Sequence, residues 1–421
     1  MTTMTTNAVE EPGREWLVPF GVTILAMLVL QMSNLGAAPL YPAIRKEFGM
    51  SYSWYGLFTG MYGLGALFLS VPGGMLAKRF GEKSVMTAGI LIVTVGLILL
   101  SLAWNTATAF AGHAIWLLGY RPAFVCVMTA IAITAPKAVG SRSMAAIGAI
   151  SAAGFIIGAP IGSRVGEAFG WRFGIRSFAA MALIGAAIFY VFYKSKAERE
   201  SLRSKREVEP VQGAAPSDAA KPKSVFRNPI LWAIALLEGM VGVGFYNATH
   251  YVPMEVKEVF HQSATDAASI LSIGFIAAIF GNMLFGYLVD RYDKWNVMAL
   301  MMGILIPAAL CMTSTNPLIF RTATAIVVAV GLSASQQSYA LASWLATGRD
   351  MGNVMGAVAF GTGIFGYIGP QTLGFLRDWT GGFNAGWCFV AGVAVLSLIV
   401  ILILKYYFKR REAAAAHPIV G

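Results

Sequence analysis

The sequence predicts an all-α membrane protein with twelve transmembrane helices in two pseudo-symmetric six-helix bundles. The first observation is compositional: 57% of the 421 residues are hydrophobic and 12% are charged, whereas soluble domains carry about 25% charged residues. The second is that apolar residues form long blocks without charge, such as Trp16 to Ile44. Blocks of about 18 or more apolar residues are typical of membrane-spanning helices. The third is a set of short motifs that recur in the same order in the second half of the chain.

The apolar blocks give the order of the expected elements. The predicted spans cover residues 17–43, 52–77, 84–104, 107–135, 144–168, 172–193, 229–253, 266–289, 296–315, 317–346, 351–376 and 383–407. They divide the chain into an N-terminal tail (1–15), an N-terminal bundle (16–193), a linker (194–228), a C-terminal bundle (229–407) and a C-terminal tail (408–421). The N-terminal tail is polar and contains three glutamates, which does not fit a cleavable signal peptide, so we expect the first span to be retained. The linker is rich in Lys and Arg and has no apolar periodicity, which predicts a flexible connection.

Positive charge is distributed unequally between the two predicted sides of the membrane. The linker, the C-terminal tail and the connections after spans two, four, eight and ten all carry Lys or Arg and share one side. By the positive-inside rule this side, with both termini, is cytoplasmic, and we expect the protein in the cytoplasmic membrane. The opposite loops carry only scattered positive residues, such as Arg45, Lys46, Lys257 and Arg377. The net charge of +11 therefore indicates contact with a lipid bilayer rather than with nucleic acid.

The repeated motifs indicate an internal duplication. The segment Gly74–Lys83 recurs 212 positions later as Gly286–Trp295, with Gly, Leu and Arg in the same places. With the same offset, Arg45 aligns with Lys257. Two parallel six-span repeats, related by an axis along the membrane normal, place a substrate site near the middle of the membrane between them.

With these motifs the chain resembles the major facilitator superfamily over all twelve spans. Gly74–Lys83 and Gly286–Trp295 are similar to the family's loop motif after spans two and eight. The small-residue segment Gly154–Gly162 in span five and the segment Gly170–Phe173 at the start of span six add to the resemblance. The resemblance implies two rocking six-helix bundles that give alternating access to a central cavity. It also implies that spans one, four, seven and ten line this cavity.

The resemblance further implies a cytoplasmic gate, or latch, between the two halves. The candidate gate residues are Lys78, Arg79, Arg142, Asp290, Arg291 and Asp350. Lys78 occupies the position at which the family has Asp, and Asp350 precedes span eleven. We therefore hypothesise an ion pair of reversed sign between Lys78 and Asp350, the alternative being a solvated Lys78. In the second repeat Asp290 matches the family pattern, and Arg142 is a plausible partner for it.

Two charged residues are predicted to lie in the middle of spans, Arg121 in span four and Glu238 in span seven. Ionisable groups at this depth are costly and are functional candidates by default. Neither is repeated, because at the offset of 212 Arg121 aligns with Ser333 and Glu238 aligns with Ala26. Arg121 is followed by a proline and is predicted to bind an anionic substrate, since guanidinium is a bidentate partner for carboxylate. Glu238 is predicted to carry a proton, and the alternative for both residues is a structural ion pair between them.

Uncharged polar residues complete the predicted substrate site. These candidates are Gln31, Asn34, Tyr246, Asn247, Gln336 and Gln337. The last two lie in the densest polar run of any span, 333–339. Some of these side chains must face inward because lipid offers no hydrogen-bond partner, but the periodicity does not identify which.

The sequence indicates a transporter without catalytic activity. It has no phosphate-binding loop, no Cys or His spacing typical of a metal site and no catalytic constellation, so we expect no enzyme and no cofactor. The predicted function is secondary transport of a small organic anion, coupled to protons or to a counter-substrate, by a monomer. The alternatives are a drug/proton antiporter, which Arg121 disfavours, and a polytopic sensor or scaffold that does not transport.

Overall fold

The computed structural model describes residues 17–134, 140–193, 227–343 and 351–416. In the first half, the helices are α1 (Leu17–Asn34), η2 (Ala38–Leu40), α2 (Tyr41–Glu47), α3 (Tyr52–Phe80), α4 (Glu82–Ser101), α5 (Thr106–Thr134), α6 (Gly140–Phe169) and α7 (Trp171–Phe192). In the second half, they are α9 (Pro229–Glu258), α10 (Ala264–Arg291), α11 (Lys294–Cys311), α12 (Pro317–Ser343), α13 (Met351–Thr380) and α14 (Asn384–Ala416). Each long helix corresponds to one predicted span, which confirms the all-α membrane fold. The predicted linker lies almost entirely outside the described residues.

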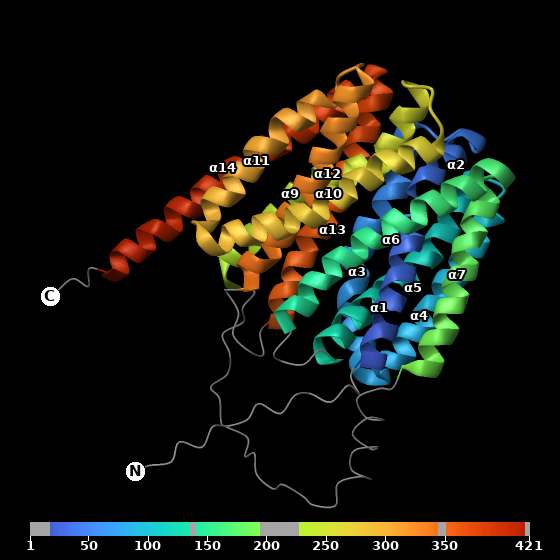
Figure 1. Ribbon diagram of the computed structural model, residues 1–421, viewed down its shortest axis with the longest axis horizontal. Coiled ribbons are helices and arrows are strands. Elements are labelled where there is room, and N and C mark those ends of the chain that lie inside the picture. The colour runs from blue at the N-terminus through green and yellow to red at the C-terminus, as the bar shows by residue number, and fades with distance from the viewer. Residues whose placement is uncertain (1–16, 135–139, 194–226, 344–350, 417–421) are drawn as a thin grey trace, which may run out of the picture.

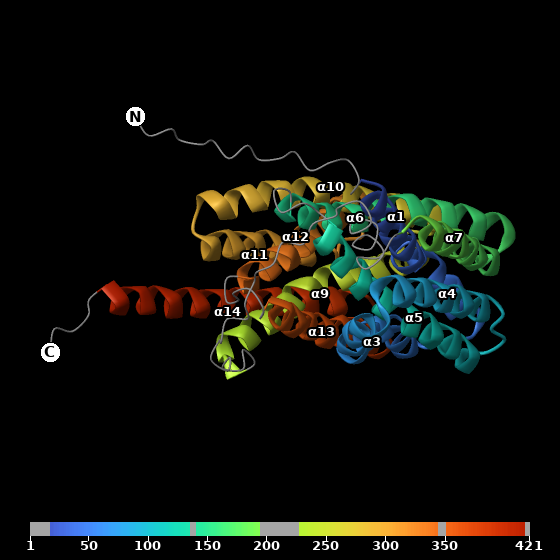
Figure 2. The same cartoon turned by 90° about the horizontal axis from the view of Figure 1, so that it is seen from below.

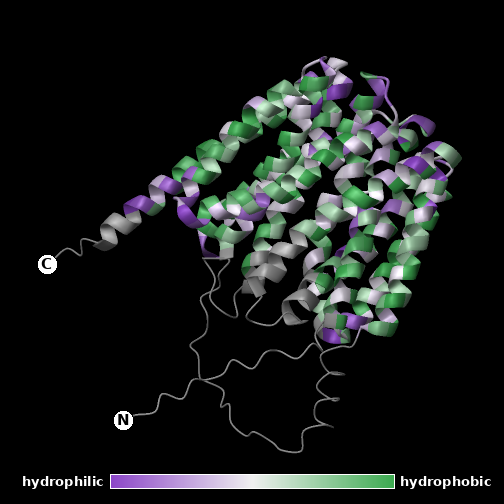
Figure 3. Cartoon of the chain, viewed as in Figure 1, coloured by the Kyte–Doolittle hydropathy of each residue, from purple (hydrophilic) through white to green (hydrophobic). Residues whose placement is uncertain are grey.

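The helices have the length and surface of membrane spans. Ten helical segments of the described chain are long and apolar enough to cross a membrane. Figure 3 shows hydrophobic residues along the length of the helices and hydrophilic residues concentrated at their ends. Large apolar side chains are exposed on the outside, including Phe280, Met283 and Ile403. Exposed apolar surface on this scale requires a lipid environment rather than water.

The first predicted span differs from the structure at its end. The sequence predicts a helix to residue 43, but α1 ends at Asn34 and the chain continues through η2 into the short helix α2. Pro39 and Pro42 lack backbone N–H groups and so cannot continue the α-helical hydrogen bonds. A Cβ on Gly36 would lie only 3.0 Å from Gly158 of α6. Glycine therefore allows this turn to lie against α6, and the turn directs α2 across one end of the bundle.

The two halves lie side by side and touch along two pairs of helices (Figures 1 and 2), α3 with α13 and α6 with α10. Small residues allow the first pair to approach closely, because a Cβ on Gly63 would lie 2.3 Å from the backbone nitrogen of Tyr367. In the second pair, the rings of Phe155 and Phe275 stack with their centroids 4.3 Å apart. Close backbone approach at small residues, as at Gly63, drives helix association in lipid.

The duplicated tryptophans make the same contact in each half. Trp171 at the start of α7 donates its indole N–H to Glu47, at 2.5 Å. Trp387 near the start of α14 donates to Glu255, at 2.8 Å. A buried indole N–H needs an acceptor. In the first half, Glu47 therefore links the start of α7 to α2, which follows α1 in the chain. In the second half, Glu255 links the start of α14 to the last part of α9.

We call the end of the bundle that carries α2, the α9–α10 turn and the α13–α14 turn the distal face. Contacts between the halves close this face. The Tyr55 hydroxyl of α3 donates to the carbonyl of His250 in α9, at 2.7 Å. The backbone N–H of Thr265 in α10 donates to the Glu167 carboxylate of α6, at 2.8 Å. Asp378 of α13 accepts from two backbone N–H groups at the start of α3, at 2.9 and 2.7 Å, where an anion is favoured by the helix dipole.

Candidate functional site

Arg121 lies in α5 and is 4% exposed. Its Nη2 donates to the backbone carbonyl of Tyr62 in α3, at 2.9 Å, and its guanidinium carbon lies 3.8 Å from the centre of the Tyr62 ring. The ring face attracts the cation, so Tyr62 holds the guanidinium by both its backbone and its side chain. Among the described residues, Nε has no hydrogen-bond acceptor. Arg121 is therefore anchored on one side and retains donors for an oxyanion.

Packing around Arg121 sets the position of this part of α5. The next residue, Pro122, lies against α3, because a Cβ on Gly73 would be 2.8 Å from the Pro122 Cα. One turn earlier, a Cβ on Gly119 would be 2.4 Å from the carbonyl oxygen of Gly89 in α4. Proline cannot donate to the preceding turn. Two glycine contacts and one proline therefore fix the backbone that carries the charge.

Glu238 lies in α9 and is completely buried. Its carboxylate accepts hydrogen bonds from the Ser335 hydroxyl of α12, at 2.7 Å, and from the Thr362 hydroxyl of α13, at 2.6 Å. The Tyr339 hydroxyl lies 3.0 Å from the Thr362 hydroxyl and extends the network. The close approach of α9 and α13 places Thr362 here, because a Cβ on Gly361 would be 1.7 Å from the Ala235 carbonyl oxygen. Within the described chain Glu238 is held by hydroxyl groups and forms no ion pair with Arg121.

Two tyrosines of the second half lie near both charges. Tyr246 of α9 and Tyr339 of α12 each interact electrostatically with both Glu238 and Arg121. Tyr246 also approaches α13, since its ring carbon lies 3.9 Å from the Cβ position of Gly366. The site thus places an N-half cation and a C-half carboxylate near one set of phenol groups that can donate or accept hydrogen bonds.

Gln31 and Asn34 of α1 are brought together by Tyr120 of α5. The Asn34 amide donates to the Tyr120 hydroxyl, at 3.0 Å, and that hydroxyl donates to the Gln31 side-chain oxygen. Tyr120 directly precedes Arg121, and its ring centre lies 5.8 Å from the guanidinium carbon. The two predicted polar residues of α1 therefore belong to the surroundings of Arg121.

The remaining predicted polar residues are not all part of this group. Asn247 is buried and donates to the carbonyl of Val243 in its own helix, at 3.1 Å, while its side-chain oxygen has no donor among the described residues. Gln337 lies towards α10, with its amide nitrogen 3.9 Å from the Cβ position of Gly286. Gln336 is exposed. In the polar run of α12, the structure places Ser335 and Tyr339 rather than the two glutamines beside Glu238.

The predicted gate lies only partly within the structure described. Arg79, Asp290 and Arg291 are exposed. Asp350 and the side chains of Lys78 and Arg142 lie outside the described residues. Both predicted gate pairs therefore remain predictions.

The structure adds four residues that the sequence did not select as site residues: Tyr62, Tyr120, Ser335 and Thr362. Thr362 is part of a small-residue pattern that indicates helix packing, and Ser335 is one of several polar residues in its run. Tyr120 adjoins Arg121 in sequence, which is a usable signal. Nothing in the sequence around Tyr62 indicates that it binds Arg121, because that contact depends on how α3 and α5 cross.

Comparisons with known proteins agree with this architecture. A family model described as Major Facilitator Superfamily matches residues 23–343 and 239–419. A putative tartrate transporter of Agrobacterium vitis is 24% identical, over 92% of this chain and 89% of its own length. A probable sulfoacetate transporter of Cupriavidus necator is also 24% identical, over 86% of this chain and 88% of its own length. The chloroplastic probable anion transporter 6 of Arabidopsis thaliana is 23% identical, over 86% of this chain and 73% of its own length.

The fold is also similar to that of a solved transporter. The crystal structure of a bacterial homologue of the human lysosomal transporter Spinster, in an inward-facing and occupied conformation, has a TM-score of 0.72 and 14% sequence identity. It covers 96% of this chain and 98% of its own. The family match, the twelve long helices and the paired halves lead to one conclusion. The chain belongs to the Major Facilitator Superfamily and is a membrane transporter, not an enzyme.

Proposed function

We propose that this protein transports a small organic anion, bearing a carboxylate or a similar oxyanion group, by alternating access and in exchange for or together with protons. The observation that carries the proposal is Arg121, a buried cation without a carboxylate partner in the described structure and with donors still free. The relatives named for tartrate, sulfoacetate and anion transport support this substrate class. In the described structure Glu238 does not pair with Arg121, and a bound anion would supply the acceptor that Arg121 lacks.

The role proposed for Arg121 follows from the way it is held. Guanidinium presents a planar array of donors that matches an oxyanion in a bidentate manner. Tyr62 occupies one face and one donor of the group, which fixes its orientation before the substrate arrives. A group already oriented loses less conformational entropy on binding.

Glu238 is the proposed proton carrier. As a carboxylate it accepts from Ser335 and Thr362. A protonated Glu238 would itself become a donor, so at least one of the two hydroxyls would have to turn and accept. Since these hydroxyls come from α12 and α13, the protonation of Glu238 would change contacts among three helices of the C-terminal half.

Counterflow in proteoliposomes with tartrate and with sulfoacetate tests the role of Arg121. We expect Arg121→Gln to abolish counterflow. Arg121→Lys should keep the charge but lose the bidentate geometry, and a charge-assisted hydrogen bond worth about 1.5–3 kcal/mol corresponds to roughly 10- to 150-fold weaker binding. Arg321→Gln, an exposed arginine of α12 bonded to Gln262, is the matched control. Anion counterflow that survives Arg121→Gln unchanged contradicts the proposal, and transport of lipophilic cations instead would favour the drug/proton antiporter.

The proton role is tested by comparing two modes of transport. Glu238→Gln should retain substrate counterflow, which needs no net proton movement, but lose uptake driven by a pH gradient. Glu255→Gln is the control, because it changes a second buried carboxyl in the same helix and keeps an acceptor for the Trp387 indole. Gradient-driven uptake that is equal in the wild type and in Glu238→Gln would assign the coupling to another group or to exchange.

A further inference from the structure

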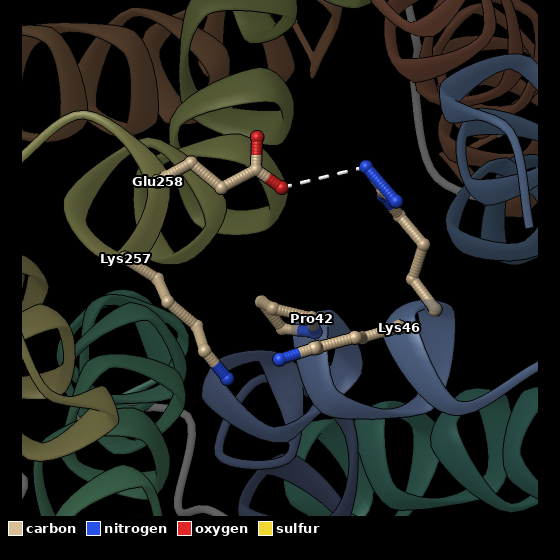
Figure 4. Close-up of a pocket in the computed structure, with 5 residues that line it drawn as sticks. Pro42, Lys46, Lys257 and Glu258 are labelled. Atoms are coloured by element: carbon tan, nitrogen blue, oxygen red, sulfur yellow. Dashed lines mark hydrogen bonds and ion pairs between the residues drawn. The ribbon is translucent and has the colours of Figure 1, made fainter. Parts of the chain in front are cut away.

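A cavity of about 360 Å³ opens on the distal face between the two halves. It is lined by Pro42, Arg45 and Lys46 of α2 and by Lys257 and Glu258 of α9 (Figure 4). Small-molecule sites typically have volumes of about 300–1,000 Å³, so the cavity can hold a small ion or metabolite. Because its walls come from both halves, the cavity is complete only while α2 and the end of α9 are close together.

The charge in this cavity is unbalanced. Three of its residues are cationic, and its only acidic residue, Glu258, is already in use. Glu258 pairs with Arg45 at 3.4 Å and with Arg377 at 3.6 Å, and it accepts a hydrogen bond from the Tyr52 hydroxyl. Lys46 and Lys257 form no ion pair with any carboxylate of the described chain. The cavity therefore retains two ammonium groups whose charge no side chain in the structure neutralises.

The two lysines extend towards each other. Figure 4 shows the side chains of Lys46 and Lys257 extending from opposite sides towards each other, below Glu258 in this view. Like charges repel, and both lysines are exposed, so their side chains are free to turn apart. An anion between them would replace this repulsion with two charge-assisted hydrogen bonds.

We propose that this cavity is a second anion-binding site, separate from the Arg121 site, in which Lys46 and Lys257 bind a small dianion such as a dicarboxylate or sulfate and Arg45 adds a third positive charge. That the dianion is also the transported substrate rests on the proposed function, but the site itself does not depend on it. A ligand held by groups of both halves binds better to the conformation in which those groups are together. Dianion binding therefore stabilises the closed distal face.

Acylation of lysines tests the site directly. Purified protein in lipid nanodiscs is treated with a sulfonated N-hydroxysuccinimide ester, and the modification of each lysine is measured by mass spectrometry. Sulfate or tartrate, compared with chloride at equal ionic strength, should protect Lys46 and Lys257, by about tenfold at a concentration of about ten times Kd. Lys409, exposed near the end of α14, is the internal control and should be unaffected.

Variants separate the two anion sites. Lys46→Gln should remove the protection of Lys257, and Lys257→Gln should remove that of Lys46. Arg121→Gln should leave the protection of both lysines intact even if counterflow is lost, so failure of the proposed transport role and failure of this site give different results. Equal protection of Lys409, equal protection by chloride, or loss of protection in Arg121→Gln but not in the two lysine variants overturns the proposal.

Discussion

Glu258 is one of the residues that hold the two halves together on the distal face. It belongs to α9 of the second half, and it binds Arg45 and Tyr52 of the first half as well as Arg377 of its own. Tyr52→Phe removes one hydroxyl and keeps the aromatic ring, over which both arginines lie at 3.7 and 4.5 Å. This substitution therefore changes a single contact between the halves with little effect on packing.

The expected effect of Tyr52→Phe can be estimated from that contact. A hydrogen bond to a charged group contributes about 1.5–3 kcal/mol when buried. The Glu258 side chain is 31% exposed, so solvent screening reduces the expected loss to about 1 kcal/mol. A loss of about 1 kcal/mol lowers the ratio of closed to open distal faces about fivefold. Glu258→Gln keeps an amide acceptor for the Tyr52 hydroxyl but weakens that bond by removing the charge, and it removes the partly exposed Arg45 ion pair between the halves, worth about 0.2–1 kcal/mol, so it should open the face as well.

Spin labels on opposite halves measure this ratio. Leu102→Cys and Leu318→Cys place labels at exposed positions near the distal ends of α4 and α12, after the exposed Cys311 and Cys388 have been replaced by Ser. Double electron–electron resonance should show a larger population of long distances in Tyr52→Phe than in the parent. Tyr287→Phe, which removes an exposed hydroxyl far from this face, should show no such increase in long distances. An unchanged distance distribution in Glu258→Gln would refute the assignment of Glu258 as a contact that holds the face closed.

Two further predictions concern the stability of the second half. Gly361→Ala should prevent correct folding, because its Cβ position is 1.7 Å from the Ala235 carbonyl oxygen. Gly392→Ala in α14 is the control: its Cβ meets no atom within 4 Å, so the substitution should be tolerated. The yield of monodisperse protein in size-exclusion chromatography tests the difference between the two variants. Trp387→Phe should lower the thermal unfolding temperature because it leaves the Glu255 carboxyl without its donor, at a cost of about 1–3 kcal/mol. Trp379→Phe, at a tryptophan that is 76% exposed, should change it little, and equal shifts in the two variants would contradict the importance of the indole–carboxylate contact.

The positions of the helices could be predicted from sequence because each helix must present apolar side chains to the lipid over its whole span. A span has to be apolar over about 20 residues, and in this chain most apolar blocks end at charged or turn-forming residues. The exception is the first span, where Gly36, Pro39 and Pro42 end the helix inside an uncharged block. In this segment the composition is still that of a membrane span, but the prolines prevent the backbone from continuing the helix. Only the spacing of the prolines therefore indicates the turn.

The central charges could be predicted as well, but their partners could not. Arg121 and Glu238 stand out because a buried charge is rare at this depth. Their partners Tyr62, Ser335 and Thr362 are ordinary components of membrane helices. Which of them faces a charge depends on the crossing of α3 with α5 and of α9 with α12 and α13, and a single helix does not determine that crossing. The polar run of α12 illustrates this limit, since Gln336 and Gln337 turn away from Glu238 while Ser335 contacts it.

The duplication explains why apparently scattered charges gather on the distal face. In two parallel repeats related by an axis along the membrane normal, equivalent positions lie on the same side of the membrane, opposite one another across the axis. Arg45 and Lys257 are equivalent in this sense, so residues near them converge between the halves wherever the connecting turns approach the axis. The turn at Gly36 brings α2 to that place. Arg121 and Glu238 have no equivalents in the repeat, and under the proposed function a substrate near them would meet a cation from one half and a carboxylate from the other. The repeat therefore places equivalent cationic residues of both halves on the distal face, whereas the unrepeated Arg121 and Glu238 give the proposed central site the asymmetry with which it would orient an anion.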